Sequence, residues 1–272
     1  MVRRRDEALI LRRFRFGESS LVVHVATRSH GRVHLLAKGA YRPTARFYAA
    51  LDLFDTLEMD WQESPGRELG TLQAAAIAVR RHRIAFDLGR YRAALTVLEL
   101  ADVGMQEGAV NAELFALAGR ALDRLLAAGP AERALVEFEL AFLHNLGLAP
   151  ALTDCASCAG PAPADGPRGS RRVAFSSQCG GRLCAECAAE ARSIGRRVGT
   201  LPESVLLQAA ALSPAPRANS GPTMDGRGRA EPDAEGLLLV RDAVARFLEY
   251  QIQSRPRSYR TFLAGPQRNA PR

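Results

Sequence analysis

The chain has 272 residues, a net charge of +8 and a sequence pI of about 9.8, and 47% of its residues are hydrophobic. This composition supplies the core of one large globular domain or of two to three smaller ones. We expect neither a membrane span nor a secretory signal, because no run of about 20 apolar residues is present and Asp6-Glu7 follows the Arg-rich start. The excess of positive charge favours a polyanionic partner, either nucleic acid or an acidic protein tail.

Residues 5–80 are predicted to form β-strands. Their apolar runs are rich in β-branched residues or alternate at period two, and turn residues separate them. The runs are Ala8–Phe16, Leu21–Ala26, Val33–Ala37, Leu51–Trp61 and Leu69–Val79. Five short strands in about 75 residues predict a small closed barrel, and the oligonucleotide-binding (OB) barrel is the commonest such fold with a nucleic-acid partner.

A basic and aromatic loop is predicted between the third and fourth strands. Proteins that bind single strands combine basic side chains for phosphates with aromatic faces for bases. The candidate DNA-binding residues of this loop are Lys38, Tyr41, Arg42, Arg46 and Phe47. The alternative is a loop whose aromatic rings cap the barrel and whose charges are simply solvated. Arg13 and Arg15, at the end of the first strand, extend the same predicted surface.

From Arg80 the hydrophobic period becomes helical. Helices are predicted over 88–101, 111–126, 131–146, 202–207 and 234–252. Residues 212–233 are rich in Pro, Gly, Ser and Arg and are interpreted as a flexible loop. Asp52 and Asp55 are interpreted as charges at a strand edge. We find no P-loop, dinucleotide-binding glycine motif or nucleophile elbow, so nothing in the sequence demands a catalytic function.

All five cysteines lie between Cys155 and Cys187. Cys155-x-x-Cys158 and Cys184-x-x-Cys187 form two symmetric pairs, and this spacing is typical of a structural zinc site with four thiolate ligands. Cys179 is the expected outsider, although it could replace one ligand. No histidine lies in the stretch, which argues against a catalytic zinc with an open position.

Two other interpretations of the cysteines are free thiols and a redox pair. A redox Cys-x-x-Cys would stand at the strand-to-helix junction of a βαβ unit, and no such pattern surrounds either pair. Disulfides would need an oxidising compartment, whereas unpaired cysteines with a zinc pattern fit the reducing cytoplasm.

The predicted fold is α+β and multidomain: a five-stranded OB barrel followed by a helical domain into which a four-cysteine zinc finger is inserted. The expected boundaries are 1–80 for the barrel, 81–150 and 191–263 for the helical domain, 151–190 for the zinc insertion and 264–272 for a disordered tail.

The order of several short motifs resembles that of the bacterial RecO family of recombination mediators. The motifs are Phe16–Val22, Thr27–Arg32, Ala37–Arg42, Gly180–Cys187 and Ser254–Arg260. Each motif alone is modest, but together they span nearly the whole chain. The resemblance has departures: Tyr41 stands where a second basic residue is common, and the loop at 212–233 is longer than usual.

The resemblance implies a DNA repair protein without enzymatic activity, located in the bacterial cytoplasm at the nucleoid. It implies binding of single- and double-stranded DNA and annealing of complementary strands. It also implies work with RecR to load RecA onto DNA coated by SSB, whose acidic tail is bound by the C-terminal domain. The alternatives are a zinc-ribbon adaptor or transcription factor that acts through protein contacts, and, less favoured, a thiol oxidoreductase.

Overall fold

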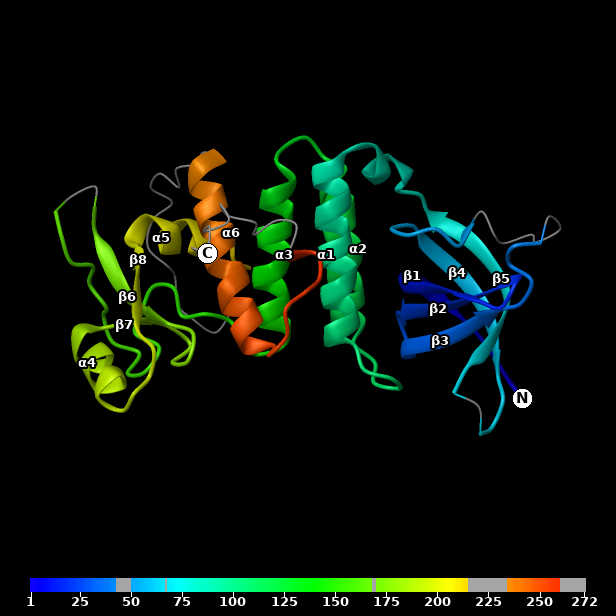
Figure 1. Cartoon of the computed structure of the whole chain (residues 1–272), viewed down its shortest axis with the longest axis horizontal. Coiled ribbons are helices and arrows are strands. Elements are labelled where there is room, and N and C mark those ends of the chain that lie inside the picture. Colours follow the sequence, from blue (N-terminus) through cyan, green and yellow to red (C-terminus); the bar gives the residue numbers. More distant parts are fainter. Residues whose placement is uncertain (43–49, 67, 168–169, 215–233, 260–272) are drawn as a thin grey trace, which may run out of the picture. The chain divides into compact units, whose positions relative to one another are not determined.

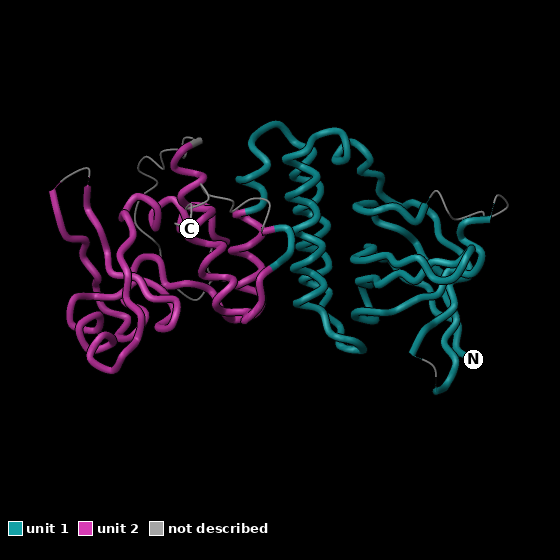
Figure 2. Tube along the Cα trace, in the orientation of Figure 1, with its two compact units in different colours: residues 1–135, 256–258 teal, residues 136–255, 259–272 magenta. Residues whose placement is uncertain are grey.

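A computed structural model of the chain describes residues 1–42, 50–66, 68–167, 170–214 and 234–259. It divides into two compact units, which Figure 2 colours separately. Unit 1 comprises residues 1–135 and 256–258, and unit 2 comprises residues 136–255 and 259–272. The predicted domain boundaries stay predictions. Among the described residues, no helix is both long and apolar enough to cross a membrane.

Unit 1 begins with five β-strands that close into a barrel (Figure 1). The strands are β1 (Val2–Phe16), β2 (Ser20–Thr27), β3 (Gly31–Ala37), β4 (Thr56–Glu63) and β5 (Gly70–Val79). Their order around the barrel is β1-β2-β3-β5-β4, with β1 and β4 paired to close it. All pairs are antiparallel except β3 with β5. This closed five-stranded barrel confirms the predicted OB fold.

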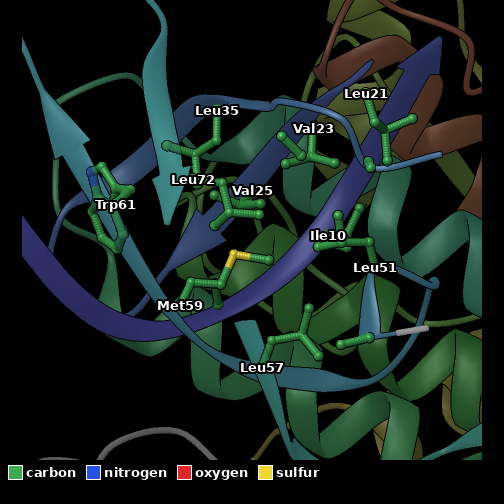
Figure 3. Packing of buried hydrophobic residues seen from close by; sticks show 14 residues of the cluster. Ile10, Leu21, Val23, Val25, Leu35, Leu51, Leu57, Met59, Trp61 and Leu72 are labelled. Carbon is green, nitrogen blue, oxygen red and sulfur yellow. The ribbon is translucent and has the colours of Figure 1, made fainter. Parts of the chain in front are cut away.

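The barrel interior is filled by the alternate apolar residues of its strands, because successive side chains point to opposite faces. Figure 3 shows Ile10, Val23, Leu57, Met59 and Trp61 packed in this core, and each of them is buried. Gly70 lies tightly packed where β5 meets β3, since a Cβ there would lie 2.9 Å from Leu35 Cδ2 and 3.2 Å from Trp61 Cδ1 and would displace these buried side chains. The interior therefore fixes which strand faces point outward.

The fourth strand begins later than the sequence predicts. Leu51 continues the apolar pattern and is buried, but the strand starts only at Thr56. Phe54 has φ +79°, in the left-handed region, which interrupts an extended strand. The expected start at Leu51 was wrong because periodicity reports burial and not backbone conformation.

The helices of unit 1 follow the barrel. The 3₁₀ helix η2 (His82–Phe86) leads into α1 (Leu88–Gly104), and α2 (Ala112–Arg124) follows. Asp87 caps α1 by accepting a hydrogen bond from the Arg90 N–H, and Asn111 caps α2 in the same way through the Leu114 N–H. Both helices begin where their capping side chains satisfy free backbone donors.

Unit 2 combines helices with a small sheet. Its elements are α3 (Ala131–Asn145, from Val136 onward), β6 (Arg172–Ser176), β7 (Gly181–Leu183), α4 (Ala185–Ser193), β8 (Gly199–Pro202), α5 (Glu203–Leu212) and α6 (Ala234–Gln251). The strands form a sheet in the order β7-β6-β8. Apolar residues of α3, α5 and α6 pack into one cluster, which includes Leu140, Val205 and Val240. The predicted loop at 212–233 and tail at 264–272 fall mostly or wholly outside the described residues.

Candidate functional site

Four cysteine thiols gather in unit 2. The Sγ atoms of Cys155, Cys158, Cys184 and Cys187 all lie within 4.8 Å of one another, and those of Cys158 and Cys184 are 4.0 Å apart. Zn–S bonds of about 2.3 Å would place thiolates roughly 3.8 Å apart at the corners of a tetrahedron. The predicted four-cysteine cluster is therefore confirmed, and its donor set and spacing fit a closed metal site.

Backbone hydrogen bonds bring the two cysteine pairs together across a long spacer. The Arg182 N–H donates to the Ala151 carbonyl at 2.9 Å, and the Ala156 N–H donates to the Arg182 carbonyl at 2.8 Å. This close approach requires glycine at 181, because a Cβ there would lie 2.4 Å from the Ala151 oxygen. The first cysteine turn is thus bonded directly to β7, which leads into the second.

Each cysteine pair lies in a turn of its own. In the first, the Ala159 N–H donates to the Cys155 carbonyl at 2.8 Å and the Cys155 N–H donates to the Gly160 carbonyl. In the second, Cys184 is the N-cap of α4, and its Sγ accepts a hydrogen bond from the Cys187 N–H at 3.5 Å. The start of α4 therefore holds both cysteines of the second pair in one turn.

The cluster perturbs the ionisation of its own thiols. Burial raises the pKa of Cys155, but backbone hydrogen bonds from Cys184, Cys158 and Ser157 outweigh it and lower that pKa to about 6. The neighbouring thiols of Cys184 and Cys155 raise the pKa of Cys187. One thiolate therefore forms readily, and its negative charge opposes the ionisation of the next thiol. A bound dication removes this opposition because it attracts all four thiolates.

Cys179 lies outside the cluster of four. Its Sγ is 3.6 Å from Nη1 of Arg196, and its N–H donates to the Ser176 carbonyl. The structure thus separates the fifth thiol from the four that surround a common centre, as the symmetric spacing predicted.

The second candidate site lies at one end of the barrel. Lys38, Tyr41 and Arg42 occupy the turn after β3 and are exposed. The Tyr41 N–H donates to the Ser19 carbonyl at 2.9 Å, and the Arg15 guanidinium lies 5.4 Å from the centre of the Tyr41 ring. We call Arg15, Lys38, Tyr41 and Arg42 the cationic end. Of the other predicted DNA-binding residues, Arg46 and Phe47 lie outside the described residues.

Arg13 interacts with residues outside the cationic end. It donates to the Leu51 carbonyl at 3.0 Å and pairs with Asp52, also at 3.0 Å. Asp52 is largely exposed, so this surface pair holds the arginine only weakly. Arg13 therefore borders the cationic end with its charge partly balanced.

The barrel's arginines differ in whether a carboxylate balances them. Most are ion-paired: Arg3 with Asp60, Arg4 with Glu63, Arg5 with Glu58, Arg12 and Arg32 with Asp102, and Arg28 with Glu7. In contrast, Arg15, Lys38 and Arg42 have no ion-pair partner in the part of the chain that the structure describes. The unbalanced positive charge of the described barrel therefore concentrates at the cationic end.

Two exposed aromatic residues beside this end were not among the predicted site residues. Phe14 is 46% exposed and Phe16 is 56% exposed, and Phe14 packs against His24 with ring centres 5.1 Å apart. Their signal in the sequence is the alternation Arg13-Phe14-Arg15-Phe16 at the end of a strand, which puts arginines on one face and phenylalanines on the other. Proteins that bind single strands combine aromatic faces with cations, and here the two kinds of side chain occupy opposite faces of the same strand end.

Comparisons with known proteins cover both units. A family model described as "Recombination protein O N terminal" matches residues 1–80, and one described as "Recombination protein O C terminal" matches residues 85–260. The chain is 33% identical over 256 residues to "DNA repair protein RecO" of Anaeromyxobacter dehalogenans strain 2CP-1, with 94% of each chain covered. It is 34% identical over 248 residues to the protein of the same name from Anaeromyxobacter sp. strain K, with 91% of each covered.

Proposed function

The chain belongs to the RecO family of DNA repair proteins, and from that premise we propose that it is a non-enzymatic recombination mediator. In this proposal it binds single- and double-stranded DNA and anneals complementary strands at the nucleoid. With RecR it helps to load RecA onto single strands coated by SSB, whose acidic tail it contacts through its helical part.

One observation carries the DNA-binding part of the proposal: the unbalanced cations of the described barrel gather at one end. Among the described residues, Arg15, Lys38 and Arg42 have no carboxylate partner, whereas Arg3 and Arg5 are paired with carboxylates of β4. Free cations displace the counterions of phosphates, and this supplies affinity without reading bases. An annealing factor needs such sequence tolerance, and it must also reduce the repulsion between two strands.

We further propose that the four clustered thiolates hold one structural zinc ion. The donor set is all sulfur and closed, so the metal would bind no substrate. When bound, it would supply the folding energy of a segment whose own apolar core is small, the cluster around Cys155, Leu183 and Ala188. Zinc is in this proposal a part of the fold of unit 2.

An annealing assay tests the proposal. Two complementary oligonucleotides, one with a fluorophore and one with a quencher, should pair faster when the protein is added. The Lys38→Ala/Arg42→Ala variant should lose most of this acceleration, because two free cations are removed from the cationic end.

Arg3→Ala/Arg5→Ala is the matched control, since it removes the same charge from the same barrel at residues that carboxylates already neutralise. It should anneal nearly as well as the wild type. No acceleration by the wild-type protein would contradict the proposed annealing activity. Equal losses in both variants would show that only net charge matters and would contradict the assignment to the cationic end.

A further inference from the structure

We infer that Arg80, Arg83 and Phe86 form a second contact surface for single-stranded nucleic acid, which continues the path of a strand bound at the cationic end. These residues, here called the η2 surface, lie at the end of β5 and on η2, between β5 and α1 in Figure 1. The inference rests on the proposed function and extends it to residues outside the motifs that indicated it.

These three side chains contribute little to the packing of the fold. Ile84 is the buried residue of η2, and Arg80, Arg83 and Phe86 are exposed. Phe86 is 81% exposed, and its ring meets that of His82 edge-on with centres 5.9 Å apart. A single exposed apolar side chain is ordinary, so Phe86 alone does not indicate a binding surface, and the charges beside it decide.

Those charges are unbalanced. Neither Arg80 nor Arg83 has a hydrogen-bond or ion-pair partner for its side chain in the described ranges of the chain. Arg81 between them is 3% exposed and is fully engaged in the fold, with Nε 2.6 Å from Asp123. Asp87, the nearest carboxylate along the chain, caps α1. The η2 surface thus repeats the chemistry of the cationic end, free arginines next to an exposed ring.

The two surfaces border the same short segment of unit 1. Arg13, beside the cationic end, donates to the Leu51 carbonyl, and the buried Arg81, between Arg80 and Arg83 in the sequence, donates to the Phe54 carbonyl, each at 3.0 Å. Three residues span at most about 11 Å even when extended, so these two carbonyls are close together. The segment from Leu51 to Phe54 thus joins the neighbourhoods of the two surfaces, and a strand that follows it would contact both.

The side chains of the η2 surface favour a single strand over a duplex. Arginine guanidinium groups contact phosphates, and an aromatic ring stacks on a base only when that base is not already stacked in a duplex. The combination of two free arginines with a protruding phenylalanine therefore fits a flexible single strand better than a rigid duplex. It also lengthens the contact beyond what the cationic end alone supplies.

Oligonucleotide length tests the inference. Wild type, Arg80→Ala/Arg83→Ala and Phe86→Ala are compared with thymidine oligonucleotides of about 4 and about 16 nucleotides, the range of site sizes for one OB fold. Phe86→Ala should bind the longer strand about five- to 150-fold more weakly than wild type does. For Arg80→Ala/Arg83→Ala, the slope of log K against log salt should fall by about 1.4. The shorter strand, confined to the cationic end, should bind all three proteins alike.

Several controls keep the outcome clear. Thermal unfolding should be unchanged in both variants because the replaced side chains are exposed. Arg3→Ala/Arg5→Ala, with the same loss of charge, should keep the wild-type length dependence. The effect of Phe86→Ala should disappear with an abasic strand of the same length, since only bases stack.

Wild type that binds the longer strand while the η2 variants bind it equally well would overturn this inference alone. An equal loss with Arg3→Ala/Arg5→Ala would also overturn it, by reducing the effect to net charge. A wild-type protein that binds neither strand would instead overturn the proposed function.

Discussion

Arg80 and Arg81 are adjacent in the sequence, but the structure gives them opposite roles. Arg81 is buried, and it contacts Asp123, Thr56, the Phe54 carbonyl and, through its N–H, Asp55. Arg81→Ala should therefore lower the free energy of unfolding by about 2–5 kcal/mol, because it leaves the buried Phe54 carbonyl and Thr56 hydroxyl without their donor. The bond from the backbone N–H to Asp55 is kept. Arg80→Ala should change the free energy of unfolding by less than about 0.5 kcal/mol. Urea unfolding followed by Trp61 fluorescence measures both, and equal effects would contradict the structural role of Arg81.

Glu139 makes the stability of unit 2 depend on pH. It is fully buried, and burial raises its pKa to about 7, although the hydrogen bond from the Tyr259 hydroxyl and the charge of Arg241 act in the opposite direction. In the unfolded chain the same carboxyl ionises near 4.5. Between these two values the unfolded chain releases a proton that the folded unit keeps, so the free energy of unfolding should fall as pH rises from about 4.5 to about 7.

The predicted size of this change is on the order of 3 kcal/mol, because the pKa rises from 4.5 to about 7. Glu139→Gln should remove it, because an amide does not titrate yet still accepts the bond from Tyr259. The exposed Glu190→Gln should keep the wild-type pH dependence. Urea unfolding at pH 5 and pH 8, followed by circular dichroism, compares the three proteins, and a pH dependence retained in Glu139→Gln would rule out this residue as its source.

At the scale of elements, the cysteine turns and β7 behave as one unit. Cys184→Ala removes a ligand and the N-cap of α4 together, so we expect it to release the metal and to unfold the segment. Cys179→Ala should keep one zinc per chain, because Cys179 lies outside the cluster. Metal analysis after dialysis, with circular dichroism, measures both variants. A folded Cys184→Ala protein that still holds its zinc would contradict the four-cysteine site.

Individual elements also show which features could be predicted from the sequence and which could not. Spacing alone predicted the cysteine cluster, because two residues between cysteines give one turn that serves one metal. Periodicity and turn residues predicted five strands and the hairpin of the second and third, but not the order of the strands around the barrel. The ion pairs of Arg3, Arg4 and Arg5 could not be predicted, since they depend on the register of β1 with β4, more than 50 residues away in sequence. Register is a tertiary property that neither strand encodes by itself.

The burial of polar residues also could not be predicted from the sequence. Asp55 was interpreted as an edge charge, but it is 5% exposed and accepts the Arg81 N–H. That interpretation was wrong because the sequence cannot show that the backbone N–H of Arg81, 26 residues away, meets this carboxylate. Composition gave the sign of the partner's charge, whereas only the fold indicates which cations are left unbalanced.

At the scale of the whole molecule, a net charge of +8 is distributed unevenly, and the account depends on that distribution. Where arginines pair with carboxylates, as along β1 and β4, the barrel surface is close to neutral. Where they do not, as at the cationic end, phosphates can take the place of the missing carboxylates. The same composition with other pairings would bind nucleic acid elsewhere or not at all.

The most direct measurement is a salt titration of single-stranded DNA binding, with wild type beside the Arg15→Ala/Lys38→Ala/Arg42→Ala variant. Each phosphate contact on a single strand contributes about 0.7 to the slope of log K against log salt, so loss of three contacts should lower the slope by about 2. Arg3→Ala/Arg4→Ala/Arg5→Ala, of equal net charge, should keep the wild-type slope. Equal slopes for wild type and the variant of the cationic end would contradict the central claim that this end holds the DNA.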